Sequence, residues 1–170
     1  MLAARRFASE QLPGVPVGVI GSSLGGAAAL LASPALDTRA MVLEAVYPAI
    51  DVAVENRLRM RLGPAARPLG PVLLMQLPWR LGVSADQLRP VDRMAHVRCP
   101  VLVIGGTEDR HTTEADTRRL YAAAREPKEL WLIPGAGHVD YFDVVGLAYR
   151  ARVLGFLEAA LGVRHARRRP

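Results

Sequence analysis

Apolar residues gather in short runs along the chain, and each run ends at glycine, proline or charged positions. The runs are Val17 to Ile20, Ala40 to Tyr47, Val101 to Ile104 and Leu130 to Ile133. Because they are short and hold few polar residues, they predict strands buried on both faces of a parallel sheet. The segments between them predict right-handed crossovers. The pattern therefore predicts an α/β protein, with a mostly parallel sheet and helices on both faces.

The segments outside these runs divide into helical and irregular patterns. Residues 1–12 are typical of the end of a helix that leads into the first run. Residues 143–160 repeat apolar positions near the helical period and predict one closing helix packed on the sheet. Residues 48–98 are rich in proline and apolar side chains, and they predict a cap-like insertion. Two interpretations of those side chains stay open: they line a site for an acyl group, or they pack on the sheet.

The first apolar run leads into a glycine-rich turn that holds a serine. Ser23 lies between Gly21 and Gly25 in G-x-S-x-G spacing, and the helix formers Ala27 to Ala32 follow. Glycines at these positions let a strand and a helix approach closely and allow the strained backbone that presents a serine hydroxyl. The order of strand, turn and helix predicts a nucleophile elbow. We expect a substitution at either glycine to damage this turn first.

Two later loops supply an acid and a histidine. Asp109 follows the third run after two glycines, and His138 follows the fourth run in the loop that begins at Pro134. Both then lie with Ser23 at carboxyl ends of strands, where open parallel sheets place their sites. A serine hydroxyl needs an imidazole to take its proton, and the imidazole needs a carboxylate to orient it. The three residues therefore predict nucleophilic catalysis.

Neighbouring residues fit these roles less well. Ser22 would have Ile20 and Leu24 at the glycine positions of the elbow. Glu108 precedes Asp109 but is less well spaced from the preceding glycine. The sequence therefore favours Ser23 and Asp109.

The remaining titratable residues near these loops lack a partner pattern. We interpret three histidines as surface, packing or tail residues, and two acids as helix caps or solvated side chains. These residues are His96, His111, His165, Asp140 and Asp143.

Taken together, three stretches resemble the α/β-hydrolase superfamily, and within it the lysophospholipase-like and serine aminopeptidase-like hydrolases. The stretches are Gly21 to Gly26, Cys99 to Asp109 and Ile133 to His138, and the resemblance extends over about residues 12–161. A lone G-x-S-x-G is a weak signal, but three matches in the expected chain order are specific.

The resemblance implies a role for each site residue. Ser23 would be the nucleophile, Asp109 the orienting acid and His138 the general base, and the N–H of Leu24 would donate to the oxyanion. The implied activity is hydrolysis of a small-molecule ester through an acyl-enzyme, with thioester and peptide bonds left open. No cofactor and no metal are expected.

The position of the elbow departs from the superfamily pattern. Its nucleophile usually lies much further along the domain, whereas here it is residue 23. We therefore expect a partial α/β-hydrolase fold that lacks its N-terminal strands and the loop with the second oxyanion donor. The elbow strand would then be an exposed edge, which predicts a homo-oligomer or a partner that carries the N-terminal half. The alternative function is an inactive fragment or interaction module that pairs through this edge.

Composition agrees with one folded unit. The chain has 170 residues, of which 51% are hydrophobic and 22% charged, so it can bury one core and is not typical of disorder. We expect a single domain over residues 1–163, with a basic tail at 164–170. The single Cys99 precludes an internal disulfide and predicts a buried structural thiol.

Charge and hydropathy exclude several classes. The net charge of +6 comes without a zinc spacing, a phosphate loop or an aromatic stacking array, so we expect no nucleic-acid partner. Residues 12–36 carry no charge, but their prolines and glycines fit a strand, turn and helix better than a membrane span. The first residues lack the apolar stretch of a secretory signal, which predicts a cytoplasmic protein.

Overall fold

The computed structural model describes residues 1–66 and 68–162 of the chain. The predicted basic tail at 164–170 lies outside the described residues, as does the last residue of the predicted domain.

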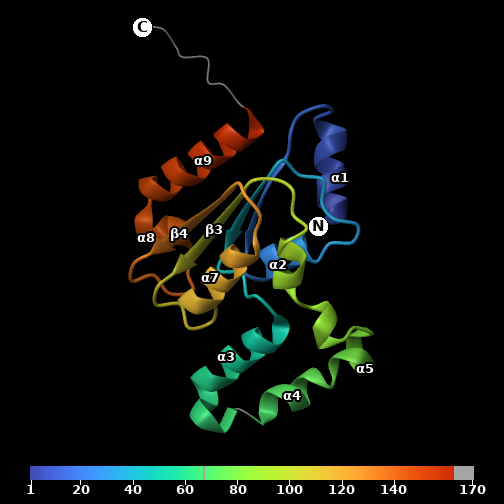
Figure 1. Ribbon diagram of the computed structural model, residues 1–170, viewed down its shortest axis with the longest axis vertical. Coiled ribbons are helices and arrows are strands. Elements are labelled where there is room, and N and C mark those ends of the chain that lie inside the picture. Colours follow the sequence, from blue (N-terminus) through green and yellow to red (C-terminus); the bar gives the residue numbers. More distant parts are fainter. Residues whose placement is uncertain (67, 163–170) are drawn as a thin grey trace, which may run out of the picture.

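The centre of the fold is a parallel sheet in which the four predicted strands lie in chain order (Figure 1). The strands are β1 (Gly18–Ser22), β2 (Ala40–Glu44), β3 (Val101–Gly106) and β4 (Lys128–Ile133). Their register pairs Ser22 with Glu44, and Glu44 with Ile104, so the carboxyl ends meet at one edge of the sheet. The predicted α/β class with a mostly parallel sheet is confirmed.

Alternating residues of the two central strands face opposite layers of the core. Met41 of β2 and Val103 of β3 pack in one cluster with Leu30 of α2 (Leu24–Leu30) and Leu120 of α7 (Glu114–Ala123). Their sequence neighbours on the strands pack in a second cluster with Val153 of α9 (Leu147–Leu161). Both faces of the sheet are therefore covered by helices, and β2 is buried at every position.

The strand β2 ends earlier than the apolar run that predicted it. The run continues to Tyr47, but the strand stops at Glu44 because Ala45 has a positive φ of 48°. The N–H of Ala45 still donates to the carbonyl oxygen of Ile104, which holds the turn against β3. Tyr47 and its neighbours stay buried without strand pairing, so apolar burial continues past the sheet.

The predicted closing helix is wrong in one respect: it is two helices rather than one. α8 (Tyr141–Val145) precedes α9, and Gly146 separates them with a φ of 52°. The N–H of Gly146 donates to the carbonyl oxygen of Phe142, so the chain turns there before helix α9 begins. Glycine adopts this backbone conformation at no steric cost. The predicted helix at the amino end is confirmed as α1 (Leu2–Gln11).

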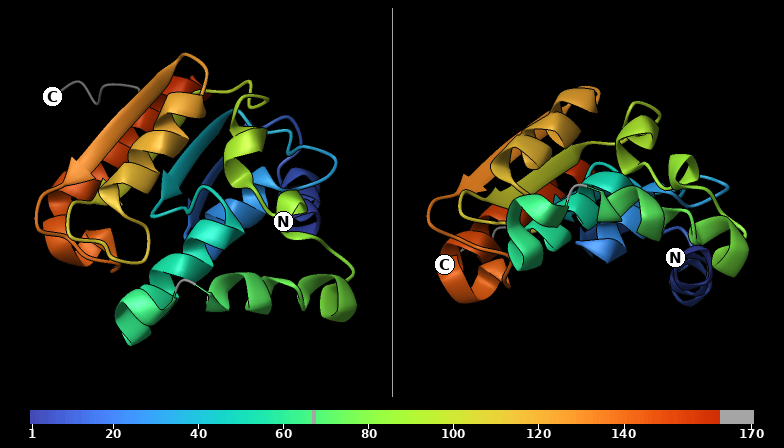
Figure 2. Two further views of the ribbon diagram at one scale, coloured as in Figure 1. Left: turned by 60° about the horizontal axis from the view of Figure 1, so that its bottom comes forward. Right: turned by 90° about the horizontal axis from the view of Figure 1, so that it is seen from below.

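Residues 48–98 form a chain of short helices, as expected of a segment that is neither sheet nor a single helix. These elements are α3 (Ile50–Leu62), η1 (Gly63–Ala66), α4 (Leu69–Leu74), α5 (Leu77–Leu81), η2 (Ala85–Gln87) and α6 (Pro90–Met94). Figures 1 and 2 show α3, α4 and α5 together beyond the end of the sheet at which β2 leads into α3. α6 returns to the core, where Met94 is fully buried, and Ala53 at the start of α3 packs in the same cluster.

Strand β1 is an edge of the sheet within the described residues. It pairs with β2 on one side only. Ile20 in this strand is 51% exposed. An apolar side chain so placed marks an unsatisfied edge strand. Across residues 1–66 and 68–162, no helix combines the length and apolarity that crossing a bilayer requires.

Candidate active site

Ser23 lies in the turn between β1 and α2, in a backbone conformation rare for a residue with a side chain. Its φ of 47° and ψ of −115° are held by two hydrogen bonds. Its N–H donates to the carbonyl oxygen of Glu44 over 2.7 Å, and its own carbonyl accepts from the N–H of Ala27 over 3.1 Å. Residues held in such sparsely populated regions cluster at functional sites. The turn has the conformation that the predicted elbow requires.

The close approach in this turn is between Gly21 and Gly26. A Cβ at Gly21 would lie 2.6 Å from the α carbon of Gly26, and a Cβ at Gly26 would lie 2.3 Å from the side chain of Val46. A Cβ at Gly25 would meet nothing within 4 Å. The expectation that a substitution at either glycine would damage the turn therefore holds for Gly21 and is corrected for Gly25: contact with the strand comes from Gly26, the next position along the helix.

Ser23, His138 and Asp109 form one continuous hydrogen-bonded row. The Oγ of Ser23 lies 3.2 Å from Nε2 of His138, and Nδ1 of His138 lies 2.7 Å from Oδ2 of Asp109. The Asp109 side chain is fully buried, whereas 24% of the His138 side chain is exposed. The structure thus brings together three residues separated by 115 positions of sequence. Each side chain has the neighbour that its predicted role requires.

The carboxylate of Asp109 is fixed by its own loop. Its Oδ1 accepts the backbone N–H groups of His111 and Thr112 over 2.7 and 2.9 Å. The hydroxyl of Thr112 in turn donates to the carbonyl oxygen of Ala45, which ties this loop to the end of β2. Oδ2 is therefore left aimed at His138, and the carboxylate cannot rotate without losing both backbone bonds.

The acid loop and the histidine loop interlock. Gly135 donates its N–H to the hydroxyl of Thr107 over 2.9 Å, and Glu108 donates its N–H to the carbonyl oxygen of Ala136 over 2.9 Å. A Cβ at Gly106 would lie 2.1 Å from that same oxygen, so only glycine permits this approach. These contacts between the loop after β3 and the loop after β4 fix Asp109 relative to His138.

His111 belongs to the site, although it was expected to be a surface or packing residue. Its ring centroid lies 4.8 Å from that of His138, and its Nδ1 is buried without a hydrogen-bond partner. Desolvation lowers the pKa of His111, and the neighbouring His138 and Arg57 lower it further, whereas the Asp109 carboxylate opposes the shift. The ring that packs against His138 therefore binds a proton less readily than a free imidazole. The only sequence signal for it is its position two residues after Asp109.

A buried polar network connects this loop to the segment beyond the sheet. Asn56 of α3 donates through Nδ2 to the carbonyl oxygen of His111 over 3.2 Å and to Oδ2 of Asp116 over 2.9 Å. Asp116 also closes the capping box of α7 with Thr113. Sequence reasoning missed Asn56, because an asparagine in the middle of a helix carries no pattern that indicates a contact 55 positions away.

Glu44 is a second buried carboxyl at the edge where the site lies. Its side chain accepts a hydrogen bond from the hydroxyl of Tyr149 in α9. Desolvation raises the pKa of Glu44, although the bond from Tyr149 opposes this shift. Burial also raises the pKa of Tyr149. The backbone carbonyl oxygen of the same Glu44 accepts the N–H of Ser23.

The other residues considered in the sequence lie outside the row. Glu108 and His96 are exposed. Asp140 accepts from the N–H of Phe142 as the N-cap of α8, and Asp143 is exposed in the same helix. The surface and capping positions expected of His96, Asp140 and Asp143 are therefore confirmed.

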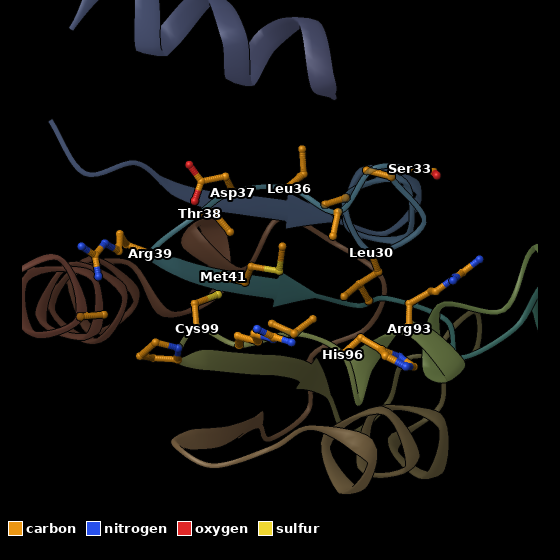
Figure 3. Close-up of a pocket in the computed structure, with 17 residues that line it drawn as sticks. Leu30, Ser33, Leu36, Asp37, Thr38, Arg39, Met41, Arg93, His96 and Cys99 are labelled. Carbon is orange, nitrogen blue, oxygen red and sulfur yellow. The ribbon is translucent and has the colours of Figure 1, made fainter. Parts of the chain in front are cut away.

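Two cavities in the described residues do not include the row. The larger, about 910 Å³, lies at the amino ends of β2 and β3, where Figure 3 shows Leu30, Met41 and Cys99 on its walls. Cys99 is half-buried in this wall rather than fully buried as expected, and desolvation raises its pKa. Neither cavity is lined by the apolar side chains of residues 50–81, many of which are exposed.

Comparisons with known proteins find relatives for part of the chain. No family model matches the chain. The uncharacterized protein YqkD of Bacillus subtilis is 27% identical over 145 residues, which are 84% of this chain and 48% of YqkD. The uncharacterized protein YfhR of Salmonella typhi is 38% identical over 66 residues, 38% of this chain and 23% of YfhR. The chain thus spans less than half the length of these curated relatives.

Solved structures extend the likeness to nearly the whole chain. The esterase domain of a Rhodothermus marinus protein matches with a TM-score of 0.64 and 26% identity, over 92% of this chain and 65% of that one. An esterase of Pyrococcus furiosus has the same fold, with a TM-score of 0.68 and 19% identity, over 92% of this chain and 59% of its own. With its parallel sheet, the chain has the fold of these hydrolases, and the likenesses support a relationship to the α/β-hydrolase superfamily.

Proposed function

We propose that the chain is the catalytic part of a serine hydrolase that cleaves an ester of a small molecule through an acyl-enzyme on Ser23. The observation that carries this proposal is the row from Ser23 through His138 to Asp109, with spacings of 3.2 and 2.7 Å. Those spacings are within reach of the proton transfers that activate a serine. The esterases of similar fold add support.

In the acylation step, the Oγ of Ser23 attacks the ester carbonyl while its proton passes to Nε2 of His138. Asp109 accepts a hydrogen bond from the Nδ1–H group, which keeps Nε2 unprotonated before attack and stabilises the imidazolium afterwards. The imidazolium then returns the proton to the leaving alcohol. Water, deprotonated by the same Nε2, attacks the acyl-enzyme, and Ser23 regains its proton when the acid leaves.

The oxyanion of each tetrahedral intermediate is assigned to the backbone N–H of Leu24. Leu24 is the first residue of α2, so its N–H is one of those without a partner inside the helix. The partial positive charge at the start of a helix favours an anion there. Removing one such donor typically costs about 10²–10³ in kcat.

The assay that tests this proposal compares matched serine variants on p-nitrophenyl acetate and butyrate. Ser23→Ala is expected to abolish turnover, whereas Ser22→Ala, one residue away on β1, is expected to retain it. Thioester and peptide analogues of the same acyl group then rank the three bond types, and we expect the ester to be cleaved fastest. Equal activity in the two serine variants would contradict the proposal.

A second function is supported by the exposed edge of β1. We propose that this edge pairs with a strand outside the described residues, either of a second copy or of a polypeptide with the remaining strands of the fold. Ile20 is half exposed at this edge. Ile20→Lys is expected to convert an oligomer to a smaller species in sedimentation velocity, and an unchanged size distribution would contradict the edge assignment. The hydrolase proposal does not depend on this result.

A further inference from the structure

The segment from Leu69 to Leu81, called here the arm, is apolar on all sides. It contains α4 and α5, and its only polar side chains are Gln76 and Arg80. A helix that is hydrophobic all round is normally buried in a core or in a membrane. The arm is instead joined to the end of α3, away from the sheet, as the views in Figure 2 show.

The side chains of the arm are among the most exposed apolar groups of the described chain. Trp79 is 92% exposed, Met75 is 70% and Leu81 is 68%. Val72 and Leu73, one turn earlier, are 57% and 45% exposed. Contiguous exposed apolar surface of this kind marks a binding site for a protein, a ligand or a membrane.

The charge around the arm is of one sign. Residues 56–85 contain no aspartate and no glutamate. Arg57, Arg59 and Arg61 lie on α3 before the arm, and Arg80 lies within it. Of the α3 arginines, Arg59 pairs with Glu55, whereas Arg57 and Arg61 have no ion pair within the described residues. The apolar arm is thus accompanied by cationic side chains without acidic residues.

We propose that the arm docks on the surface of a lipid bilayer that contains anionic lipids, with its apolar side chains in the headgroup and upper acyl region. Apolar helical segments with arginines beside them bind this interface through buried apolar area and attraction to anionic lipids. Tryptophan is favoured at that depth because its ring is amphipathic. A second copy is a poorer occupant, because pairing two arms would bring arginines together with no acid to offset them.

Docking would place the bilayer at the end of the molecule that holds the site. The arm follows α3, and α3 contacts the His111 loop through Asn56. The surface that would face the lipid therefore lies beyond the carboxyl ends of the strands, which is also where the row lies. The docking proposal concerns the surface alone and does not depend on whether the row is catalytically active.

The test is flotation of the whole chain with two kinds of vesicle, phosphatidylcholine alone and phosphatidylcholine mixed with phosphatidylglycerol. We expect the protein to float with the mixed vesicles and to remain largely unbound with the neutral ones. A Trp131→Phe protein keeps Trp79 as its one tryptophan, since the sequence has two. Its emission is expected to shift to shorter wavelength on the mixed vesicles as Trp79 leaves water.

Two sets of variants separate the apolar and ionic parts of the interaction. Replacing Met75, Trp79 and Leu81 together by serine is expected to lower the partition coefficient at least about a hundredfold. The matched control is Leu147→Ser, which removes a side chain 78% exposed on α9 and is expected to leave binding unchanged. All three arm positions are exposed, so the fold, checked by circular dichroism, is expected to survive.

For the ionic part, Arg57 and Arg61 are replaced together by glutamine. Partition onto mixed vesicles is expected to fall about fivefold for each charge removed. Glutamine at Arg119 and Arg150, which are exposed on α7 and α9, makes the same change in net charge elsewhere and is expected to have little effect. Absence of flotation, equal binding to neutral vesicles, or unchanged binding by the serine variant would each overturn the proposal. So would self-association that the serine variant abolishes, since a second copy would then be the occupant.

Discussion

The ring of His111 packs against the ring of His138, with centroids 4.8 Å apart and planes tilted by 39°. Because burial and neighbouring basic groups lower the pKa of His111, this contact places a ring that resists protonation beside the imidazole that is proposed to become an imidazolium. The carbonyl oxygen of His111 is held by Asn56, so the segment beyond the sheet supports the position of this ring.

The lowered pKa of His111 predicts a loss of stability in mild acid. The folded state binds its proton less readily than the unfolded chain, so this contribution is present above the ordinary value of 6.5 and is lost as pH falls below it. We expect His111→Gln to flatten the decline in the free energy of unfolding between neutral pH and pH about 5. Urea denaturation at several pH values measures this, and an unchanged slope would refute the assignment.

The raised pKa of Glu44 predicts the opposite dependence, a loss of stability as the pH rises. Desolvation raises its pKa above the ordinary 4.5, so its contribution is fully present below that value and is lost as pH rises through the folded pKa. Glu44→Gln keeps an acceptor for the Tyr149 hydroxyl and removes the buried charge. We expect the variant to gain stability relative to the wild type at neutral pH but not in acid. A uniform change at all pH values would argue against a buried charge as the cause.

The elbow glycines are expected to differ in their sensitivity. Gly21→Ala forces a Cβ against Gly26 and is expected to destabilise the fold by about 1–3 kcal/mol, as overpacking typically does. Gly25→Ala enters open space and is expected to be neutral or slightly stabilising, because alanine is the better helix former. Unfolding midpoints in urea compare the two, and equal losses would contradict the close approach of Gly21 to Gly26.

Asp109→Asn tests the orientation of the imidazole. The asparagine oxygen can keep the bonds from His111 and Thr112, which turns its NH₂ group toward Nδ1 of His138. The histidine would then be held in the wrong tautomer, and kcat is expected to fall by about 10⁴ with little loss of stability. Steady-state kinetics with a parallel unfolding curve measure both. Asp143→Asn, an exposed acid on α8, serves as the control.

Asn56→Leu removes the donor for both the His111 carbonyl and Asp116. Asp116 keeps its bonds from Thr113, but the His111 carbonyl loses its side-chain donor, and this is expected to cost about 1–3 kcal/mol of unfolding free energy. Glu55→Gln changes an exposed neighbour on the same helix and is expected to cost less than about 1 kcal/mol. Equal effects of the two substitutions would mean that the network does not stabilise the loop.

The parts of the fold that the sequence predicted are those with a local pattern. Val101 to Ile104 and Leu130 to Ile133 were recognised as strands because their apolar residues are continuous, and the strands in turn located the loops of Asp109 and His138. The elbow was found because glycines, a serine and a run of alanines occur in one window.

The parts that were missed depend on backbone conformation or on distant contacts. Nothing about an alanine indicates that Ala45 will take a positive φ and end β2 early. Gly146 falls within the apolar period that predicts one helix, so the sequence pattern does not show that the chain is interrupted there between α8 and α9. His111 and Asn56 became site residues only when folding joined α3 to the loop after β3. The close contact of Gly26 with Gly21 likewise depends on how the helix leaves the turn.

The central claim is that Ser23 is activated by His138, and the most direct measurement is the intact mass of the chain after exposure to a fluorophosphonate. Such a probe reacts with an activated serine and does not require the substrate to be known. We predict a single adduct on the wild type and on Ser22→Ala, and none on Ser23→Ala or His138→Ala. Absence of any adduct on the folded wild type, or an adduct that persists in Ser23→Ala, would contradict the account.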